Sequence, residues 1–154
     1  MPTELELAGR LGAALVLGGA IGLERELTGQ VAGLRTHMSV ALGAALFGIV
    51  SAYGWNEFAQ VRAQTNVQVD VTRVASNIVT GVGFLGGGAI LRGDKGVHGM
   101  TTAATIWVNA AIGMAAGAGE FATASAATGL TIVVLAVLPP IESYFERRGN
   151  RSKE

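Results

Sequence analysis

Polar residues are scarce in this chain, and several of them recur at spacings of three or four positions. Residues spaced in this way lie on one face of an α-helix, so their side chains can act together. They form two series: Asp70, Arg73, Asn77 and Thr80, and then Thr102, Thr105 and Asn109. In a hydrophobic segment, such groups either form hydrogen bonds between helices or line a polar seam for an ion or a regulated contact. The spacing leaves both interpretations open.

A second set of candidates lies where apolar stretches end. Glu24 and Arg25 follow the first stretch, and Arg35 precedes the second. A carboxylate and a guanidinium at facing helix ends can form an ion pair, which is stronger near a bilayer than in water. Such a pair is either an ordinary contact at the membrane edge or part of a functional site. Histidine titrates near neutral pH, but we interpret His37 and His98 as incidental residues at the membrane edge.

Catalytic and cofactor chemistry find little support in these residues. The chain has no Cys, which excludes disulfides and thiolate sites. It contains neither an H-E-x-x-H pattern nor a nucleophile elbow around a serine, so we expect no enzyme activity and no cofactor. The segment 81–86 matches G-x-G-x-x-G, but no alternating strand precedes it, and nucleotide binding is therefore not expected. A net charge of zero also argues against a nucleic-acid partner.

The presence of a metal site stays open at this stage. Magnesium takes oxygen ligands and keeps several waters, and no Asp or Glu lies in the middle of the apolar stretches. We therefore expect any cation to be held hydrated, or at the ends of the helices near Glu24, Asp70 or Asp94.

Long stretches without charge dominate the rest of the sequence. Only 14% of residues are charged and 50% are hydrophobic, whereas a soluble domain is about 25% charged. A membrane-spanning helix needs ~20 mostly apolar residues, and four uncharged runs reach that length: 36–56, 74–91, 96–119 and 121–141. We predict an all-α integral membrane bundle of about five transmembrane helices, the first of which contains Arg10. The expected helices lie near residues 5–23, 36–54, 74–91, 100–118 and 121–138.

The predicted membrane domain covers residues 1–141, and residues 142–154 form a basic tail. Pro139 and Pro140 are expected to end the last span, because proline interrupts helical hydrogen bonding. Lys and Arg favour cytoplasmic loops, and they are concentrated in the tail and in the loops on its side of the membrane. This distribution predicts an external N-terminus and a cytoplasmic C-terminus. It requires the first stretch to span despite Arg10, whose side chain we expect to reach the outer interface.

Glycine accounts for 23 of the 154 residues. In membranes, glycines four positions apart let helix backbones approach closely. We expect such packing, within the chain or between copies in a homo-oligomer, at eight positions: Gly18, Gly22, Gly81, Gly83, Gly86, Gly87, Gly113 and Gly117.

Several of these motifs together resemble the MgtC/SapB family. They occur in the family's order: Gly22–Glu26, Ala32–His37, Asp70–Ala75, Gly81–Gly88 and Thr101–Trp107. The resemblance implies a multi-pass protein of the bacterial inner membrane, linked to growth in low magnesium, to stress adaptation and to restraint of the F-type ATP synthase. The family often has Pro in place of Val71 and Arg in place of His98, and its longer members carry a soluble C-terminal domain.

Two functions compete on these grounds. The one that we favour is a non-enzymatic regulator in magnesium and stress adaptation that acts through a partner in the membrane. The alternative is a transporter or channel for a cation or small solute, which would be oligomeric because about five helices leave little room for a lumen. The small-residue faces favour the regulator, and the polar seam from Asp70 to Asn109 favours the transporter.

Overall fold

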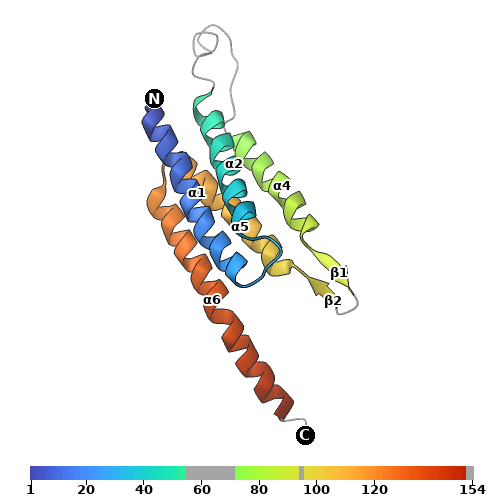
Figure 1. Ribbon diagram of the computed structural model, residues 1–154. Helices are drawn as coiled ribbons and strands as arrows, with labels where there is room; N and C mark the ends of the chain where they lie inside the picture. The colour runs from blue at the N-terminus through green and yellow to red at the C-terminus, as the bar shows by residue number, and fades with distance from the viewer. Residues whose placement is uncertain (55–71, 94–95, 152–154) are drawn as a thin grey trace.

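The computed structural model describes residues 1–54, 72–93 and 96–151 of the chain. This part consists of helices and one short hairpin: α1 (Glu4–Leu27), α2 (Leu34–Tyr53), α4 (Thr72–Gly88), β1 (Leu91–Gly93), β2 (Gly96–His98), α5 (Met100–Ala118) and α6 (Phe121–Arg151). The predicted all-α class is therefore confirmed (Figure 1). Asp70 and Asp94, near which a cation was expected, lie outside the described residues.

Three of the described helices are long and apolar enough to cross a membrane. They are α1, α2 and the segment Phe121–Phe145 of α6. α4 and α5 contain 17 and 19 residues, and their crossing of the membrane stays a prediction.

Capping residues explain where α1 begins and where α5 ends. Thr3 begins α1: its Oγ1 accepts a hydrogen bond from the Glu6 N–H at 3.2 Å, and the Glu6 carboxylate accepts one from the Thr3 N–H at 2.7 Å. These bonds satisfy N–H groups that have no partner inside the helix. Gly119 ends α5 with a φ of +90°, a left-handed conformation that glycine adopts without strain.

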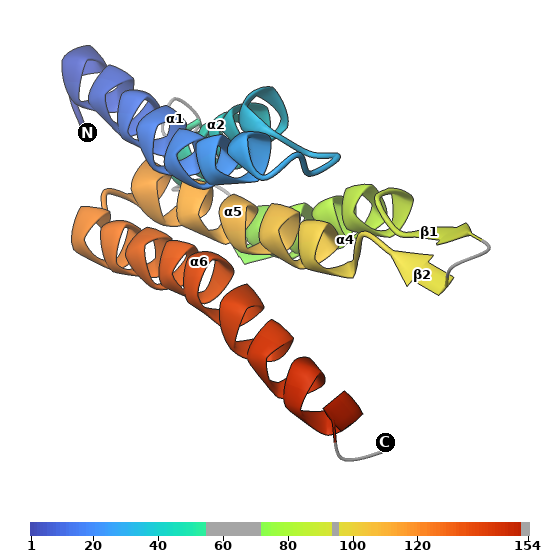
Figure 2. The ribbon, with the colours of Figure 1, turned by 60° about the horizontal axis from the view of Figure 1, so that its bottom comes forward.

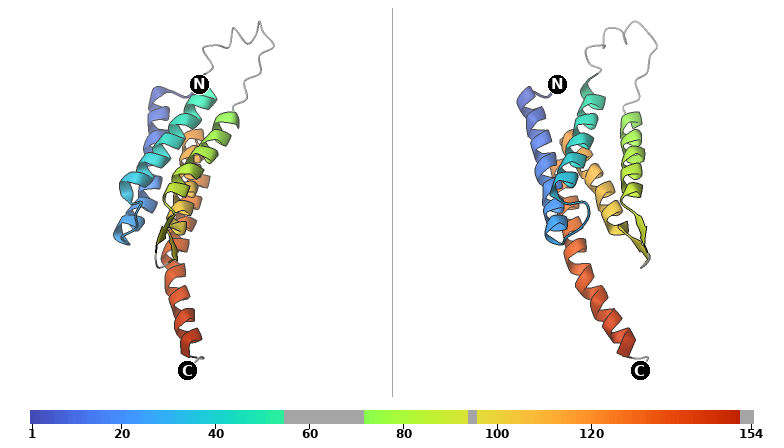
Figure 3. Two further views of the ribbon diagram at one scale, coloured as in Figure 1. Left: turned by 90° about the vertical axis from the view of Figure 1, so that its right-hand side faces the viewer. Right: turned by 45° about the vertical axis from the view of Figure 1, so that its right-hand side comes forward.

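The prediction that Pro139 and Pro140 end the last helix is wrong. α6 continues through both prolines to Arg151, so residues 142–151 of the predicted tail extend this helix beyond the bundle (Figures 1 and 3). The φ of proline is compatible with a helix, and its cost is a missing N–H donor and a clash one turn back. Residues 136–145 are exposed, so the backbone of α6 can bend there to relieve that clash.

α5 is the central helix of the bundle, because it contacts each of the four other described helices. α1 and α2 pack against each other and against α5, while α4 lies beside α5 and α2, and α6 lies beside α5 and α1 (Figures 1 and 2). One apolar cluster joins α1, α2, α5 and α6, and a second joins α2, α4 and α5. Alanine is the commonest residue in both clusters, so the helix backbones can approach closely.

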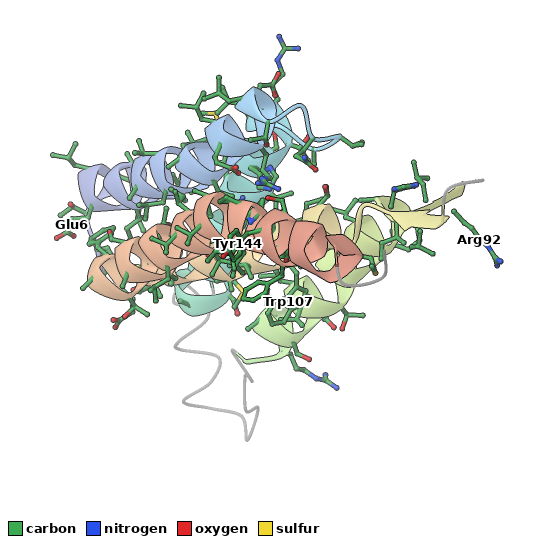
Figure 4. The ribbon with its side chains drawn as sticks, turned by 90° about the horizontal axis from the view of Figure 1, so that it is seen from below. Glu6, Arg92, Trp107 and Tyr144 are labelled. Atoms are coloured by element: carbon green, nitrogen blue, oxygen red, sulfur yellow. The ribbon has the colours of Figure 1, made fainter. Side chains whose placement is uncertain are left out.

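The two ends of the bundle carry different elements. The N-terminus and the turn between α5 and α6 lie at one end, whereas the α1–α2 loop and the β1–β2 hairpin lie at the other (Figure 1). In the hairpin, Leu91 pairs with His98 and Arg92 with Val97 in antiparallel register. The side chain of Arg92 projects away from the helices (Figure 4).

Candidate functional site

Fully buried polar side chains gather between α2 and α5. His37 and Asn109 are 0% exposed, Thr102 is 1% exposed and Thr105 is 4% exposed. Asn109 Nδ2 donates a hydrogen bond to the backbone oxygen of His37 at 2.6 Å, and His37 Nε2 lies 3.3 Å from Thr105 Oγ1. Both contacts cross from α5 to α2 and tie these helices together. We call these four residues the His37 cluster.

Two further contacts of the His37 cluster are local in sequence, and one of its polar atoms is unpaired. His37 Nδ1 lies 2.9 Å from the backbone oxygen of Gly33, to which it can donate. The Thr105 hydroxyl lies 2.9 Å from the backbone oxygen of Thr102. Asn109 Oδ1 is buried and has no hydrogen-bond partner among the described residues. The cluster therefore contains one acceptor that is left unpaired.

α2 and α5 meet backbone to backbone in the turns that follow the His37 cluster. A Cβ atom on Gly113 would lie 2.2 Å from the Ala41 oxygen, and one on Gly117 would lie 2.7 Å from the Ala45 oxygen. Neither distance can accommodate a side chain, since interiors are packed close to van der Waals contact. Two of the glycines predicted to pack are thus found at the contact between these helices.

α1 closes the third side of the His37 cluster through Gly18 and Gly22. A Cβ atom on Gly18 would lie 2.5 Å from Ala41 Cβ and 3.2 Å from Asn109 Nδ2. A Cβ atom on Gly22 would lie 2.8 Å from Leu34 Cα. Glycine at these two positions lets α1 approach closely enough to seal the polar cluster from its surroundings.

Glu24 and Arg25 pair with each other at the end of α1, and not across to Arg35 as predicted. Arg25 Nη2 donates to Glu24 Oε1 at 2.7 Å, and Arg25 Nε donates to the other oxygen of the same carboxylate. Arg25 is 5% exposed, whereas Arg35 is exposed. The carboxylate that reaches α2 is Glu26, which accepts a hydrogen bond from the Leu34 N–H at 3.0 Å. Glu26 satisfies an N–H of the first turn of α2, which has no partner inside that helix.

The polar series on α4 lies on the surface of the described chain. Arg73, Asn77 and Thr80 are exposed, and Phe84 is 83% exposed. A Cβ atom on Gly81, Gly83 or Gly87 would meet no described atom within 4 Å. The expectation that these three glycines pack within the chain is therefore wrong, and contacts between copies stay a prediction. We define the open face of α4 by six residues: Arg73, Asn77, Thr80, Gly83, Phe84 and Gly87.

α4 packs on α5 through its opposite side. Ile78 and Val82 are each 9% exposed, and a Cβ atom on Gly86 would lie 3.3 Å from the Ala103 oxygen. α5 presents apolar residues to α4, including Ile106, while the His37 cluster faces α2 and α1. The two polar series thus point to different neighbours, and the predicted seam is not formed among the described residues.

A groove of about 640 Å³ separates α2 from α4 beside the open face. Its walls are mostly apolar and include Val40, Gly43 and Phe47 from α2, and Asn77 and Gly81 from α4. Gly43 and Gly81 have no described atom within 4 Å of a built Cβ. Because glycine has no side chain, these two positions leave the groove open.

At the other end of the bundle, Arg10 joins the ends of α2 and α5. Its Nη1 donates to the Gly117 oxygen at 3.0 Å and to the Tyr53 hydroxyl at 3.1 Å. The guanidinium carbon lies 5.6 Å from the centre of the Tyr53 ring, a cation–π distance. Arg10 thus satisfies a carbonyl at the C-terminal end of α5 and is part of the fold.

Comparison with known proteins decides the family. The model of the MgtC family matches residues 11–144. The chain belongs to the MgtC family. The resemblance noted in the sequence is confirmed, and family membership together with the apolar helices identifies a membrane protein.

Relatives of this MgtC-family chain include one that is named a putative magnesium transporter. It is 48% identical over 128 residues to the putative magnesium transporter YhiD of Escherichia coli strain K12, a match that covers 83% of this chain and 58% of the relative. It is 40% identical over 141 residues to Protein MgtC of Brucella abortus strain 2308, covering 92% of this chain and 55% of the relative. The chain spans less than two thirds of the length of these relatives. No solved structure matches it.

Sequence reasoning missed the place of His37 in this MgtC-family bundle. His37 was interpreted as an incidental residue at the membrane edge, but it is fully buried and contacts α5. One signal was available: His37, Ala41 and Ala45 are four positions apart, which places the imidazole on a small-residue packing face. Its partner Thr105 is 68 positions away in sequence, and no local pattern indicates that contact.

The described part of this MgtC-family chain has no group of three or more His, Cys, Asp or Glu side chains placed to hold a metal ion. Glu24, near which a cation was expected, is bound to both Nε and Nη2 of Arg25.

Proposed function

We propose that this MgtC-family protein is a non-enzymatic regulator in the bacterial inner membrane, tied to magnesium supply and stress adaptation. It acts by binding a membrane partner through the open face of α4. The observation that carries this proposal is the polarity of that face.

The open face of α4 is poorly suited to contact with lipid. Arg73, Asn77 and Thr80 are exposed there, and polar or charged side chains in a membrane normally face protein or a water-filled cavity. Gly83 and Gly87 have open space where a Cβ would stand, so the backbone of another helix can approach α4 closely. The combination supports a covering helix from another protein molecule.

The groove between α2 and α4 adds to the surface that such a helix would contact. Apolar side chains such as Val40 and Phe47 line it, next to Gly43 and Gly81. Bulky side chains of the partner would fill this space, while its small residues would face Gly83 and Gly87. In lipid, close packing of this kind and hydrogen bonds between helices drive helix association.

The buried polar groups have a structural role, in contrast to those on the open face of α4. Asn109 and His37 are joined across α2 and α5, and Arg10 is joined to Gly117 and Tyr53. These groups hold the bundle together, whereas the polar groups on the open face of α4 are free to contact a partner.

A second candidate function rests on the same face. If several copies met at α4, Arg73, Asn77 and Thr80 would line a polar path between them, and the protein would be an oligomeric transporter or channel for Mg²⁺, another cation or a small solute. The relative in Escherichia coli is named a putative magnesium transporter, which favours this alternative.

The partner and the orientation belong to the same proposal. The family resemblance points to a membrane complex such as the F-type ATP synthase, and a second copy of this chain is the other candidate. Basic residues lie in the helix ends that flank the α1–α2 loop, in the hairpin and in the C-terminal tail. Their distribution supports a cytoplasmic C-terminus and an external N-terminus.

Crosslinking from defined positions tests this proposal, because the natural chain has no Cys. A Thr80→Cys variant carries a thiol on the open face of α4, and a Leu130→Cys variant carries one on α6, where Leu130 is 68% exposed. Both are labelled with a thiol-linked photocrosslinker in native membranes. We expect a discrete adduct with another membrane protein from position 80 and none from position 130. Equal labelling from both positions would remove the case for α4.

Flux measurements separate the regulator from the transporter. The purified protein is reconstituted in liposomes that contain a magnesium-sensitive dye, and Mg²⁺ entry is followed with the natural chain and with Asn77→Leu. We expect no flux above that of empty liposomes. Flux that Asn77→Leu abolishes, together with adducts only between copies at position 80, would establish the transporter in place of the regulator.

A further inference from the structure

The imidazole of His37 and the hydroxyl of Thr105 together have more hydrogen-bond contacts than the protons of two neutral groups can satisfy. The backbone oxygen of Gly33, 2.9 Å from Nδ1, is only an acceptor, so Nδ1 carries a proton. In a neutral imidazole the other nitrogen, Nε2, is then without a proton and acts as an acceptor. Its neighbour at 3.3 Å is Thr105 Oγ1, whose hydroxyl has a single proton to donate.

That one hydroxyl proton has two competing acceptors. Thr105 Oγ1 lies 2.9 Å from the backbone oxygen of Thr102 and 3.3 Å from His37 Nε2. With a neutral ring, the proton goes to one acceptor and the other contact is lost. With a protonated ring, Nε2–H donates to Thr105 Oγ1 while the hydroxyl donates to the Thr102 oxygen. All three contacts of the observed geometry are then hydrogen bonds.

We propose that His37 is a buried proton-binding site of this protein and that Thr105 is the residue that accepts the hydrogen bond from the bound proton. The ligand is the proton itself, and the site lies at the junction of α1, α2 and α5. This inference concerns the core of the bundle and is independent of a partner on α4.

Few charged groups face this ring. From α1, the guanidinium of Arg25 and the carboxylate of Glu24 act on His37 with opposite signs. They are paired with each other, so the field of each partly offsets that of the other at the ring. α5 contributes only uncharged groups in the described range from Thr102 to Asn109. Arg35, two residues before His37 on α2, is exposed.

The uncharged surroundings of the ring also affect whether His37 binds the proton. Burial opposes a charge on the ring, and so does the position of His37 near the positive N-terminal end of α2. The Gly33 oxygen and Thr105 Oγ1 favour the charge by accepting its two N–H groups. Asn109, whose amide nitrogen lies 2.6 Å from the His37 oxygen, keeps a buried oxygen without a partner in the described chain.

Binding of the proton would change the contact between α2 and α5. The protonated ring holds Thr105 through a charge-assisted hydrogen bond, which is about twice as strong as a neutral one. The adjacent bond from Asn109 to the His37 oxygen lies on the same pair of helices. Acidification would therefore act on the contact between α2 and α5, and both of these helices support α4.

The test is nuclear magnetic resonance of ¹⁵N-histidine in the full chain, reconstituted in lipid nanodiscs. The chain has two histidines, and His98→Gln leaves only the signals of His37. We expect Nδ1 to carry a proton at every pH and Nε2 to gain one as the pH is lowered. An Nε2 that stays unprotonated over the whole pH range in which the protein is folded would overturn the proposal.

Variants at Thr105 identify the acceptor. Thr105→Val keeps the shape but removes the oxygen, and we expect the proton affinity of His37 to fall about tenfold or more. Thr105→Ser restores the hydroxyl and should restore the affinity. Thr101→Val, at an exposed position of the same helix, is the matched control and should leave it unchanged. The same titration in Thr105→Val and in the natural chain would show that Thr105 does not hold the proton.

Discussion

A Cβ atom on Gly113 would lie 2.2 Å from the backbone oxygen of Ala41. Two helix backbones are in direct contact at this point, so a rotation of a side chain cannot relieve the overlap. The Asn109–His37 bond lies one turn away on the same helix pair. Gly113 therefore sets the distance between α5 and α2 at which the polar contacts can form.

Gly113→Ala is the first test of this relationship. The added methyl group must push α5 away from α2, and overpacking of this kind costs typically about 1–3 kcal/mol. We expect a loss of about 2 kcal/mol or more in the free energy of unfolding, measured by denaturant titration in detergent micelles. Gly129→Ala is the control, because α6 has open space there. Equal stability of the two variants would contradict the close contact.

Two substitutions at Asn109 are expected to differ in how strongly they destabilise the bundle. Asn109→Asp keeps the shape but replaces the donor with an acceptor at 2.6 Å from the His37 oxygen. We expect it to destabilise the bundle more than Asn109→Ala, which only removes a membrane hydrogen bond worth about 0.6–2 kcal/mol. The comparison uses the same denaturant titration at neutral pH. An Asp variant as stable as the natural chain would show that the amide does not donate to α2.

Substitutions at two glycines of α4 distinguish packing within the chain from packing against a partner. Gly86 lies against α5, with 3.3 Å between its built Cβ and the Ala103 oxygen, whereas Gly83 has open space. We expect Gly86→Leu to reduce the yield of monodisperse protein. Gly83→Leu should give a normal yield but lose the crosslinked partner at position 80. Size-exclusion chromatography and the crosslinking assay measure these two effects, and a loss of yield from Gly83→Leu alone would reverse the assignment of the two faces.

A labelling experiment tests the orientation of the bundle in the membrane. Thr3→Cys lies at the N-terminus and Ser143→Cys on the exposed extension of α6. If the N-terminus is external and the C-terminus cytoplasmic, a membrane-impermeant maleimide should label position 3 in intact spheroplasts and position 143 only after lysis. Labelling of both positions in intact spheroplasts would contradict the predicted topology.

The extension of α6 illustrates a limit of local rules. Pro139 and Pro140 were predicted to stop the last helix, yet α6 continues to Arg151. Proline removes hydrogen bonds at its own position and disturbs the turn before it, but whether the chain leaves the helix depends on its freedom to bend. That freedom follows from the absence of packed neighbours around the exposed residues 136–145 in the described chain, which the local sequence does not reveal.

The amino-acid sequence by itself determined that this chain is helical and belongs in a membrane. Long uncharged runs leave few alternatives, because backbone groups in lipid must find their partners within a helix. The three- and four-residue spacings also showed which residues share a helix face, since that spacing is a local property of the helix. Thr102, Thr105 and Asn109 are all buried on α5, as residues that share one helix face can be.

Only the tertiary structure decided which face meets which neighbour. Two polar series looked like the halves of one seam, but one is buried against α2 and α1 and the other is exposed on α4. Which face packs against which helix depends on how closely the helices can approach. They come close where Gly113 meets Ala41 and where Gly18 lies beside Asn109. Such contacts join residues far apart along the chain, and no periodicity within a single helix encodes them.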